Sequence, residues 1–241
     1  MSGDEAAPPV FYVPFDGVDP DLAVRAGAAW LGDQAGRPLV LLHAKNMYGN
    51  NPLLPRLTAG ATVEKPVSLF GSRWSHGPVL APWPTVEVLG CISDQLRGRA
   101  TAVCVLMWGD DPRQAAWLQA NRARHLTTND VYGETSAQPL SPVVEAAMRF
   151  LERHVNHANG LVSSYDRDSA IVVLQRLHHA GYSLDADELY AWALANGFGH
   201  RESGRLREYA QKVKRGHRFR LQHPSILRED IVALWETEAE S

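Results

Sequence analysis

The stretch "ATAVCVLMW", residues 100–108, is apolar at almost every position and is followed directly by "GDDPRQAAWLQANRA", residues 109–123. An apolar run on consecutive residues is typical of a strand that is covered on both faces, as in a parallel sheet. The residues after it form a helical pattern, with Asp111 as N-cap and Pro112 at the first helical position. The two together predict one strand–helix unit of a parallel α/β sheet.

The same alternation extends back along the chain to Val10. Because strand–helix–strand crossovers are right-handed, it predicts an α/β fold with a Rossmann-like, mainly parallel sheet over residues 10–128. Further candidate strands are "VFYVP" (10–14), "PLVLLH" (38–43), "ATVEKPV" (61–67) and "GPVLAPW" (77–83), and candidate helices span 19–34, 51–60 and 84–96.

The pattern changes after a Gly-, Ser- and Pro-bearing segment, residues 129–141, which we interpret as a linker. Residues 142–241 then form five helical patterns, the first capped by Ser141 and the last spanning 223–239. This predicts a C-terminal all-helical domain.

Composition excludes several classes of protein. The 241 residues carry a net charge of −3, so the chain is not a polycation that coats nucleic acid. Its two cysteines, Cys91 and Cys104, lie in apolar segments, which indicates reduced core residues and a cytoplasmic location. Apolar runs stay well short of the roughly 20 residues that span a membrane, and the N-terminus lacks a secretory h-region. No membrane partner is expected.

Polar and aromatic residues follow or precede the predicted strands. In an open parallel sheet, ligands bind at the carboxyl ends of the strands beside a topological switch point. The candidate catalytic residues are Asp16, His43, Lys45 and Asp110, and the candidate ligand-binding residues are Asn46, Asn50, Arg73, Trp74, Trp83 and Trp108. Strand ends are polar in any α/β protein, so an ordinary polar rim stays open as the alternative.

Familiar catalytic motifs are absent from the sequence. It contains no GxxxxGK[ST], no GxGxxG after the first strand and no GxSxG, so no cofactor is assigned. The histidine pairs His154/His157 and His178/His179 have no neighbouring Cys or HExxH pattern, so no metal site is assigned.

Residues 201–220 carry the clearest charge signal, with eight Lys or Arg against two Glu. Cations interleaved with aromatic rings can bind nucleic-acid phosphates. A solvated helix with a cationic last turn, or a surface for another protein, explains the same residues. The candidate nucleic-acid-binding residues are Arg207, Lys212, Lys214, Arg215, Arg218 and Arg220.

Two sets of segments resemble known proteins. "HAKNMYGN", residues 43–50, resembles half of the HxKxxxxD signature of phospholipase D-like phosphodiesterases, with Asn50 at the position of the acid. "GPVLAPWP" (77–84), "AWALANG" (191–197) and "LREYAQKVKRG" (206–216) resemble segments of uncharacterised actinobacterial proteins, which implies a bacterial origin and no particular activity.

We therefore expect a cytoplasmic protein that handles nucleic acid or nucleotides, with a phosphodiesterase or nuclease as one form of that function. A non-enzymatic protein-interaction module and a nucleotide- or NAD-type hydrolase are the alternatives. Whether the chain is an enzyme stays open at this point.

Overall fold

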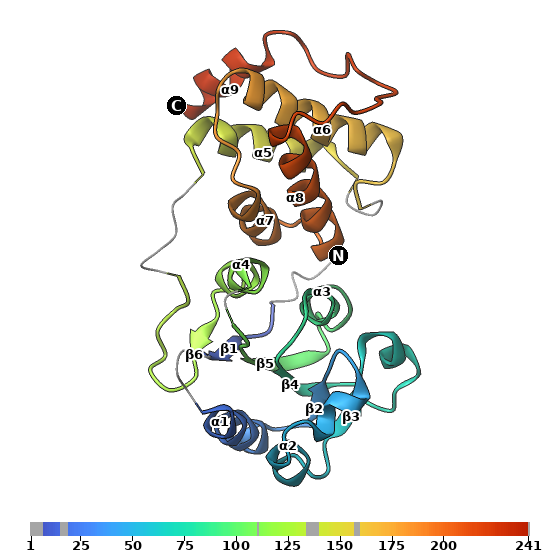
Figure 1. Cartoon of the computed structure of the whole chain (residues 1–241), viewed down its shortest axis with the longest axis vertical. Helices are drawn as coiled ribbons and strands as arrows, with labels where there is room; N and C mark the ends of the chain where they lie inside the picture. The colour runs from blue at the N-terminus through green and yellow to red at the C-terminus, as the bar shows by residue number, and fades with distance from the viewer. Residues whose placement is uncertain (1–6, 15–18, 110, 134–139, 157–159, 241) are drawn as a thin grey trace. The chain divides into compact units, whose positions relative to one another are not determined.

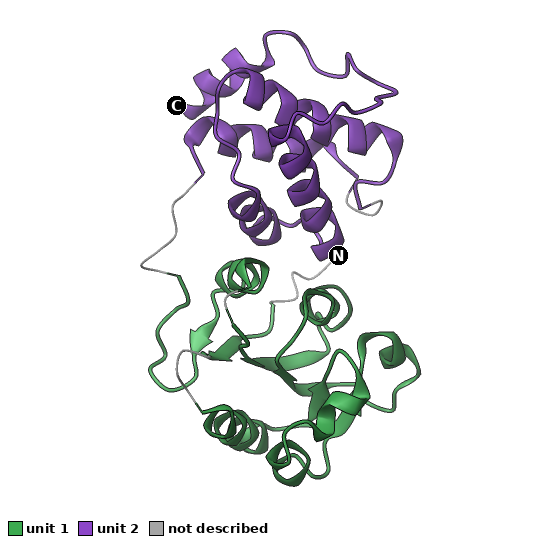
Figure 2. Ribbon diagram, viewed as in Figure 1, with its two compact units in different colours: residues 1–135 green, residues 136–241 purple. Residues whose placement is uncertain are grey.

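Figure 1 shows the computed structural model of the chain, which describes residues 7–14, 19–109, 111–133, 140–156 and 160–240. The chain divides into two compact units, residues 1–135 and residues 136–241 (Figure 2). The division falls within the predicted linker, residues 129–141.

Unit 1 is built on a six-stranded sheet with the order β3-β2-β4-β5-β1-β6, in which every neighbouring pair is parallel. The α/β prediction is confirmed. The strand β6 was missed, because it has two residues and neither is buried. The strands are β1 (Val10–Val13), β2 (Leu39–Leu41), β3 (Thr62–Glu64), β4 (Gly77–Pro82), β5 (Ala100–Leu106) and β6 (Arg124–His125).

Helices cover both faces of the sheet. In Figure 1, α1 and α2 lie on one face, and α3 and α4 lie on the other. Asp19 and Asp111 cap α1 and α4 as predicted, since each carboxylate accepts a hydrogen bond from the backbone N–H two residues on. The elements are α1 (Pro20–Asp33), α2 (Leu53–Leu57), α3 (Val86–Gln95), α4 (Pro112–Ala120) and the 3₁₀ helices η1 (Lys45–Gly49) and η2 (Pro66–Gly71).

The strand order creates a topological switch point between β2 and β4. The connection from β2 leads outward to β3, whereas the connection from β4 leads the opposite way to β5. Loops that leave two adjacent strands in opposite directions open the sheet edge between them, which is where doubly wound proteins bind ligands. His43 follows β2 and Trp83 follows β4, so both lie at this point.

The core of unit 1 consists of the central strands and the helices that cover them. β2 and β4 are buried at every position, which explains their unbroken apolar sequence. Gly27 brings α1 close to the sheet: a Cβ there would meet a side-chain carbon of Leu106 at 2.7 Å. Cys91 and Cys104 are buried free thiols, as predicted.

Unit 2 is a helical domain around one apolar core, and each of the five helices in its described residues contributes to that core. Ser141 precedes α5, but its side chain makes no capping hydrogen bond. The last predicted helix was too long, because residues 223–230 form turns and only Ile231–Ala239 is helical. The helices are α5 (Pro142–His154), α6 (Ser164–His179), α7 (Ala186–Ala195), α8 (His200–Lys214) and α9 (Ile231–Ala239). None of the helices in the described ranges has the length and apolar character that crossing a membrane requires.

Candidate functional site

His43 is exposed and lies two residues beyond Leu41, the last residue of β2. Its Nδ1 is 3.2 Å from Oγ1 of Thr85, the residue that precedes α3. Glu87 lies in the first turn of α3. Its pKa lies below its ordinary value, mainly through the neighbouring Thr85 hydroxyl; its own backbone N–H and the charges of His43 and Arg113 act in the same direction, against burial.

The hydrogen bond between Thr85 Oγ1 and His43 Nδ1 joins the loop after β2 to the start of α3. Thr85 and Glu87 were not among the residues predicted from the sequence.

Lys45 is held by a carboxylate from the neighbouring strand end. Its Nζ lies 2.8 Å from Oε2 of Glu64, the last residue of β3. Burial raises the pKa of Glu64, but hydrogen bonds from Lys45, Ser68 and Ser72 together outweigh it and leave that pKa below its ordinary value. The charge of Lys45 is therefore already neutralised by an ionised partner.

The predicted asparagines divide into exposed and structural positions. Asn46 and Asn50 are exposed, in η1 and at its end. Asn51, which was not among the candidates, is buried and donates from Nδ2 to Asp21 Oδ1 at 2.8 Å, while its Oδ1 accepts from the N–H of Leu53. Asn51 thus joins the start of α2 to α1.

Two tryptophans follow the central strands. The rings of Trp83 and Trp108 meet edge to face, with centroids 6.3 Å apart. Trp83 has a φ of +50°, which is rare for a bulky residue and is typical of strained functional loops. The buried amide of Gln114 connects the two loops, since its Nε2 donates to Pro84 O and its Oε1 accepts from Trp108 N. Trp108 is 57% exposed.

Arg73 and Trp74 lie at the end of the sheet where the parallel strands begin, whereas His43 lies beyond the end of β2. They precede β4, and Trp74 donates from Nε1 to the carbonyl of Arg37, which precedes β2. Arg99, which precedes β5, stacks on the Trp74 ring and donates to its carbonyl. Trp74 is buried in these contacts, so the structure does not place this pair with His43.

The remaining predicted rim residues, Asp16 and Asp110, lie outside the described residues. Among the residues that the structure does describe, no three His, Cys, Asp or Glu side chains are grouped as metal ligands would be.

The basic stretch of unit 2 divides into paired and exposed cations. Arg207 pairs with Asp187 at 2.6 Å and Lys212 pairs with Glu208 at 2.6 Å. The other four candidate cations lie at the end of α8 and in the segment after it, and they are exposed. We call residues 214–220, "KRGHRFR", the basic segment; its cations are Lys214, Arg215, Arg218 and Arg220.

Asp168 anchors the chain directly beyond the basic segment. This carboxylate is fully buried on α6, and its Oδ2 accepts the backbone N–H of Gln222 at 2.6 Å and of His223 at 2.9 Å. Its Oδ1 accepts from Arg167, which in turn donates to the carbonyl of Arg220. Nothing in the sequence singled out Asp168.

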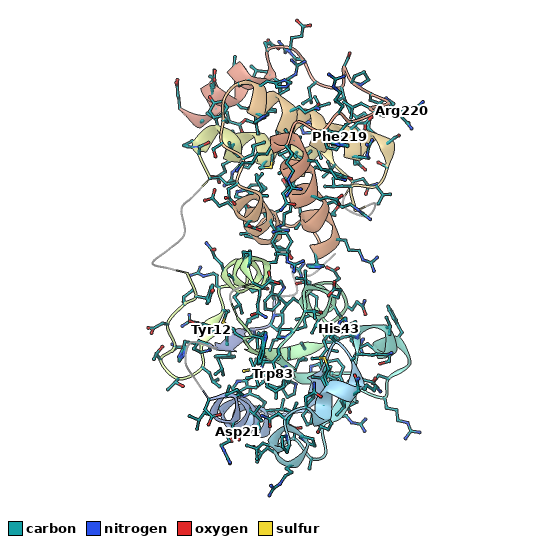
Figure 3. The ribbon with its side chains drawn as sticks, viewed as in Figure 1. Tyr12, Asp21, His43, Trp83, Phe219 and Arg220 are labelled. Atoms are coloured by element: carbon teal, nitrogen blue, oxygen red, sulfur yellow. The ribbon has the colours of Figure 1, made fainter. Side chains whose placement is uncertain are left out.

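Aromatic rings lie within the basic segment and beside it. Phe219 packs against the core of unit 2, and its ring meets those of His217 and Tyr209 edge to face at 4.8 and 6.3 Å. Figure 3 shows Phe219 against the helices and Arg220 at the outer edge of the unit. Phe219 therefore holds the basic segment against the core of unit 2, while the four cations of the segment are exposed to solvent.

The positive charge is local. Residues 136–241 contain 13 Lys or Arg and 14 Asp or Glu, so unit 2 as a whole is not basic. From Tyr209 to Leu227, however, there is no Asp or Glu at all.

Comparisons with known proteins find one family for unit 2: residues 140–236 are similar to a family described as a domain of unknown function, DUF1889. None of the curated proteins matches the chain. A crystal structure of a protein from Salmonella typhimurium is similar at 19% identity, covering 41% of this chain and 97% of that one, with a TM-score of 0.36. No comparison supports the phospholipase D-like motif.

Proposed function

We propose that the chain is a nucleic-acid-binding protein that contacts backbone phosphates through the basic segment of unit 2. The observation that carries the proposal is the state of its four cations: Lys214, Arg215, Arg218 and Arg220 are exposed, and no described carboxylate pairs with them. A cation that is already paired gains little from a phosphate, whereas an exposed one releases counterions when it binds.

The anchoring by Asp168 supports this proposal. Binding by a flexible loop costs about 1–2 kcal/mol of backbone entropy per residue that is ordered. The two hydrogen bonds from Gln222 and His223 to a buried carboxylate hold the far end of the segment, and α8 holds its near end. The cations are thus presented on a chain that is fixed at both ends, which lowers this cost.

The size of the patch sets the expected affinity. Four phosphate contacts are fewer than the roughly 6–10 of strongly salt-dependent DNA-binding proteins. We therefore expect sequence-independent binding with a Kd on the order of 1–100 μM at physiological salt. Arg207 and Lys212, which the sequence also suggested, contribute less because Asp187 and Glu208 hold them.

The test is fluorescence anisotropy of the full chain with a labelled duplex and a labelled single strand at about 50 mM salt. The double variant Arg215→Gln/Arg218→Gln should weaken binding by at least about tenfold. A matched control is Arg149→Gln/Arg153→Gln, which removes the same charge from exposed positions of α5 that pair with Glu145 and Glu238. Equal losses in the two variants would show a net-charge effect and would contradict a site at the basic segment.

A protein-interaction module is the second candidate, and one observation favours it. Val67 and Phe70, in η2, are 79% and 87% exposed, which is unusual for large apolar side chains. Sedimentation of the full chain at micromolar concentration compares wild type with Val67→Ser/Phe70→Ser. A self-association that the double variant abolishes would favour this candidate for unit 1. Catalysis at His43 and a cytoplasmic location stay predictions.

A further inference from the structure

Two aromatic residues beside the basic segment bear on which form of nucleic acid the protein binds. We infer, resting on the proposed function, that this nucleic acid is single-stranded and that one of its bases stacks on the ring of Tyr165, beside His223. Tyr165 lies in the first turn of α6, and His223 lies in the chain that follows the basic segment. Figure 1 shows this chain running along α6, where the two rings meet.

The first argument is that the Tyr165 ring lies within reach of the phosphate-binding cations. The ring centroids of Tyr165 and His223 are 5.9 Å apart. His223 is three residues beyond Arg220, so their Cα atoms are at most about 11 Å apart. Arg167, two residues after Tyr165, donates from Nη1 to the carbonyl of Arg220 at 3.3 Å. A strand whose phosphates contact the basic segment can therefore place a base on this ring.

The second argument is that the Tyr165 ring offers a surface to a flat ligand. Tyr165 is 54% exposed, although it is a large aromatic residue. Its contact with His223 is tilted, with 58° between the ring planes, so the imidazole does not lie flat over the phenol ring. Exposed aromatic rings beside a run of cations are the combination on which the bases of single strands stack.

The third argument is that the backbones carrying both rings are fixed. The Ser169 hydroxyl donates to the carbonyl of Tyr165 at 2.9 Å, and the buried carboxylate of Asp168 holds the backbone N–H of His223. A ring on a fixed backbone loses little freedom when a base stacks on it, so more of the stacking energy remains as affinity.

The fourth argument is the charge around the ring. Asp166 and Asp168 are the acidic residues nearest to Tyr165 in the sequence, and both are buried. Asp168 pairs with Arg167 at 2.8 Å, and Asp166 accepts a hydrogen bond from the Ser163 hydroxyl at 2.6 Å. Carboxylates that are held in this way repel an approaching phosphate less than exposed, unpaired ones would.

Stacking on Tyr165 selects a single strand over a duplex. In a duplex each base lies between its neighbours, so its face is not accessible to a protein ring unless the base is extruded from the stack. Phosphates, by contrast, are available in both forms. Loss of the ring should therefore weaken the binding of a single strand and leave the binding of a duplex, which uses the basic segment alone, nearly unchanged.

The inference is tested on the full chain by fluorescence anisotropy with two probes, a labelled oligothymidylate of about 15 nucleotides and a labelled duplex of the same length. The measurements are made at about 100 mM salt, which weakens phosphate contacts but not stacking. Wild type should bind the single strand at least about fivefold more tightly than the duplex. Tyr165→Ala should weaken single-strand binding by about fivefold or more and duplex binding by less than about twofold. Tyr165→Phe, which keeps the ring, should bind both probes like wild type.

Phe70→Ala is the matched control, because it removes an exposed aromatic ring of unit 1 and should change neither affinity. Retained duplex binding shows that each variant is folded. Binding of neither probe would overturn the proposed function and this inference together. Binding that depends on Arg215 and Arg218 but not on the Tyr165 ring would support the proposed function and overturn the inference alone. A duplex that binds as tightly as the single strand, or a Tyr165→Phe variant that loses as much affinity as Tyr165→Ala, would also overturn the inference.

Discussion

The carboxylate of Asp168, on α6, accepts a hydrogen bond from the backbone N–H of His223, which lies 55 residues further along the chain. The bond is 2.9 Å long and its acceptor is fully buried. Together with the Gln222 N–H and Arg167, it gives Asp168 three donors, which is what a buried carboxylate needs to remain stable.

We predict that Asp168→Ala destabilises unit 2 by about 2–4 kcal/mol, because it leaves two backbone donors and one guanidinium without their acceptor. Urea unfolding followed by circular dichroism measures the change. Asp187→Ala is the control: Asp187 pairs with Arg207 near the surface, so its loss should cost no more than about 1 kcal/mol. A cost below about 0.5 kcal/mol for Asp168→Ala, the range of ordinary surface substitutions, would show that the anchor does not stabilise the unit.

A second prediction concerns Gly77, the first residue of β4. Its φ is +144°, and an added Cβ would lie 2.3 Å from the backbone oxygen of Arg37. Because backbone atoms cannot move aside as a side chain can, Gly77→Ala should destabilise unit 1 by at least about 2 kcal/mol. Gly32→Ala is the matched control in α1. Apart from its own helix backbone and chain neighbours, no described atom lies within 4 Å of the added Cβ, so this variant should be neutral or stabilising by up to about 1 kcal/mol. Thermal unfolding distinguishes the two; similar melting temperatures would refute the steric explanation.

The cysteines provide a chemical test of the core. Burial raises the pKa of the Cys91 thiol to about 11, with Asp94 adding to the effect, and burial alone raises the pKa of Cys104 further. At pH 8 only about one Cys91 thiol in a thousand is then a thiolate, the form that reacts. A thiol-reactive chromophore should therefore modify neither cysteine in the native protein and both in about 6 M guanidinium chloride. Rapid modification of either native thiol would contradict the described packing.

Glu64 predicts a dependence of stability on pH. Its pKa is lower in the folded protein than its ordinary value, so its contribution is present above the unfolded-state pKa and is lost as pH falls through the folded value. Glu64→Gln should cost about 1 kcal/mol at pH 7 and progressively less below about pH 4. Urea titrations at pH 7 and below about pH 4 measure this difference in the free energy of unfolding. A cost that is the same at both would exclude the ion pair with Lys45 as its source.

The fold could be predicted from the sequence because each local pattern agreed with the others. The runs at β2 and β4 are buried throughout, and the run at β5 is buried at every position but one, so their composition shows their environment directly. Asp19 and Asp111 precede a proline at the first helical position, which marks the helix starts. The strand β6 gave no such signal, because two partly exposed residues form no apolar run.

The candidate site was harder to predict from the sequence than the fold, because the residues that contact one another there are distant in sequence. Thr85 meets His43 across 42 residues, and no local pattern indicates that contact. Trp74 and Trp83 both adjoin β4, yet they lie at opposite ends of it, and only the structure separates a core tryptophan from one at the switch point. In the basic stretch, the pair Lys212–Glu208 follows from helical spacing, whereas Arg207–Asp187 needs the packing of α7 on α8.

The salt dependence of nucleic-acid binding tests the central claim most directly. With four phosphate contacts, the affinity for duplex DNA should fall about 150-fold between about 50 and 200 mM salt, at about 0.9 log units per contact for each tenfold increase. Arg215→Gln/Arg218→Gln should halve the slope of log affinity against log salt, and Arg149→Gln/Arg153→Gln should leave it unchanged. Anisotropy that stays flat at about 50 mM salt and about 100 μM protein, or a slope that the first variant does not reduce, would contradict binding through the basic segment.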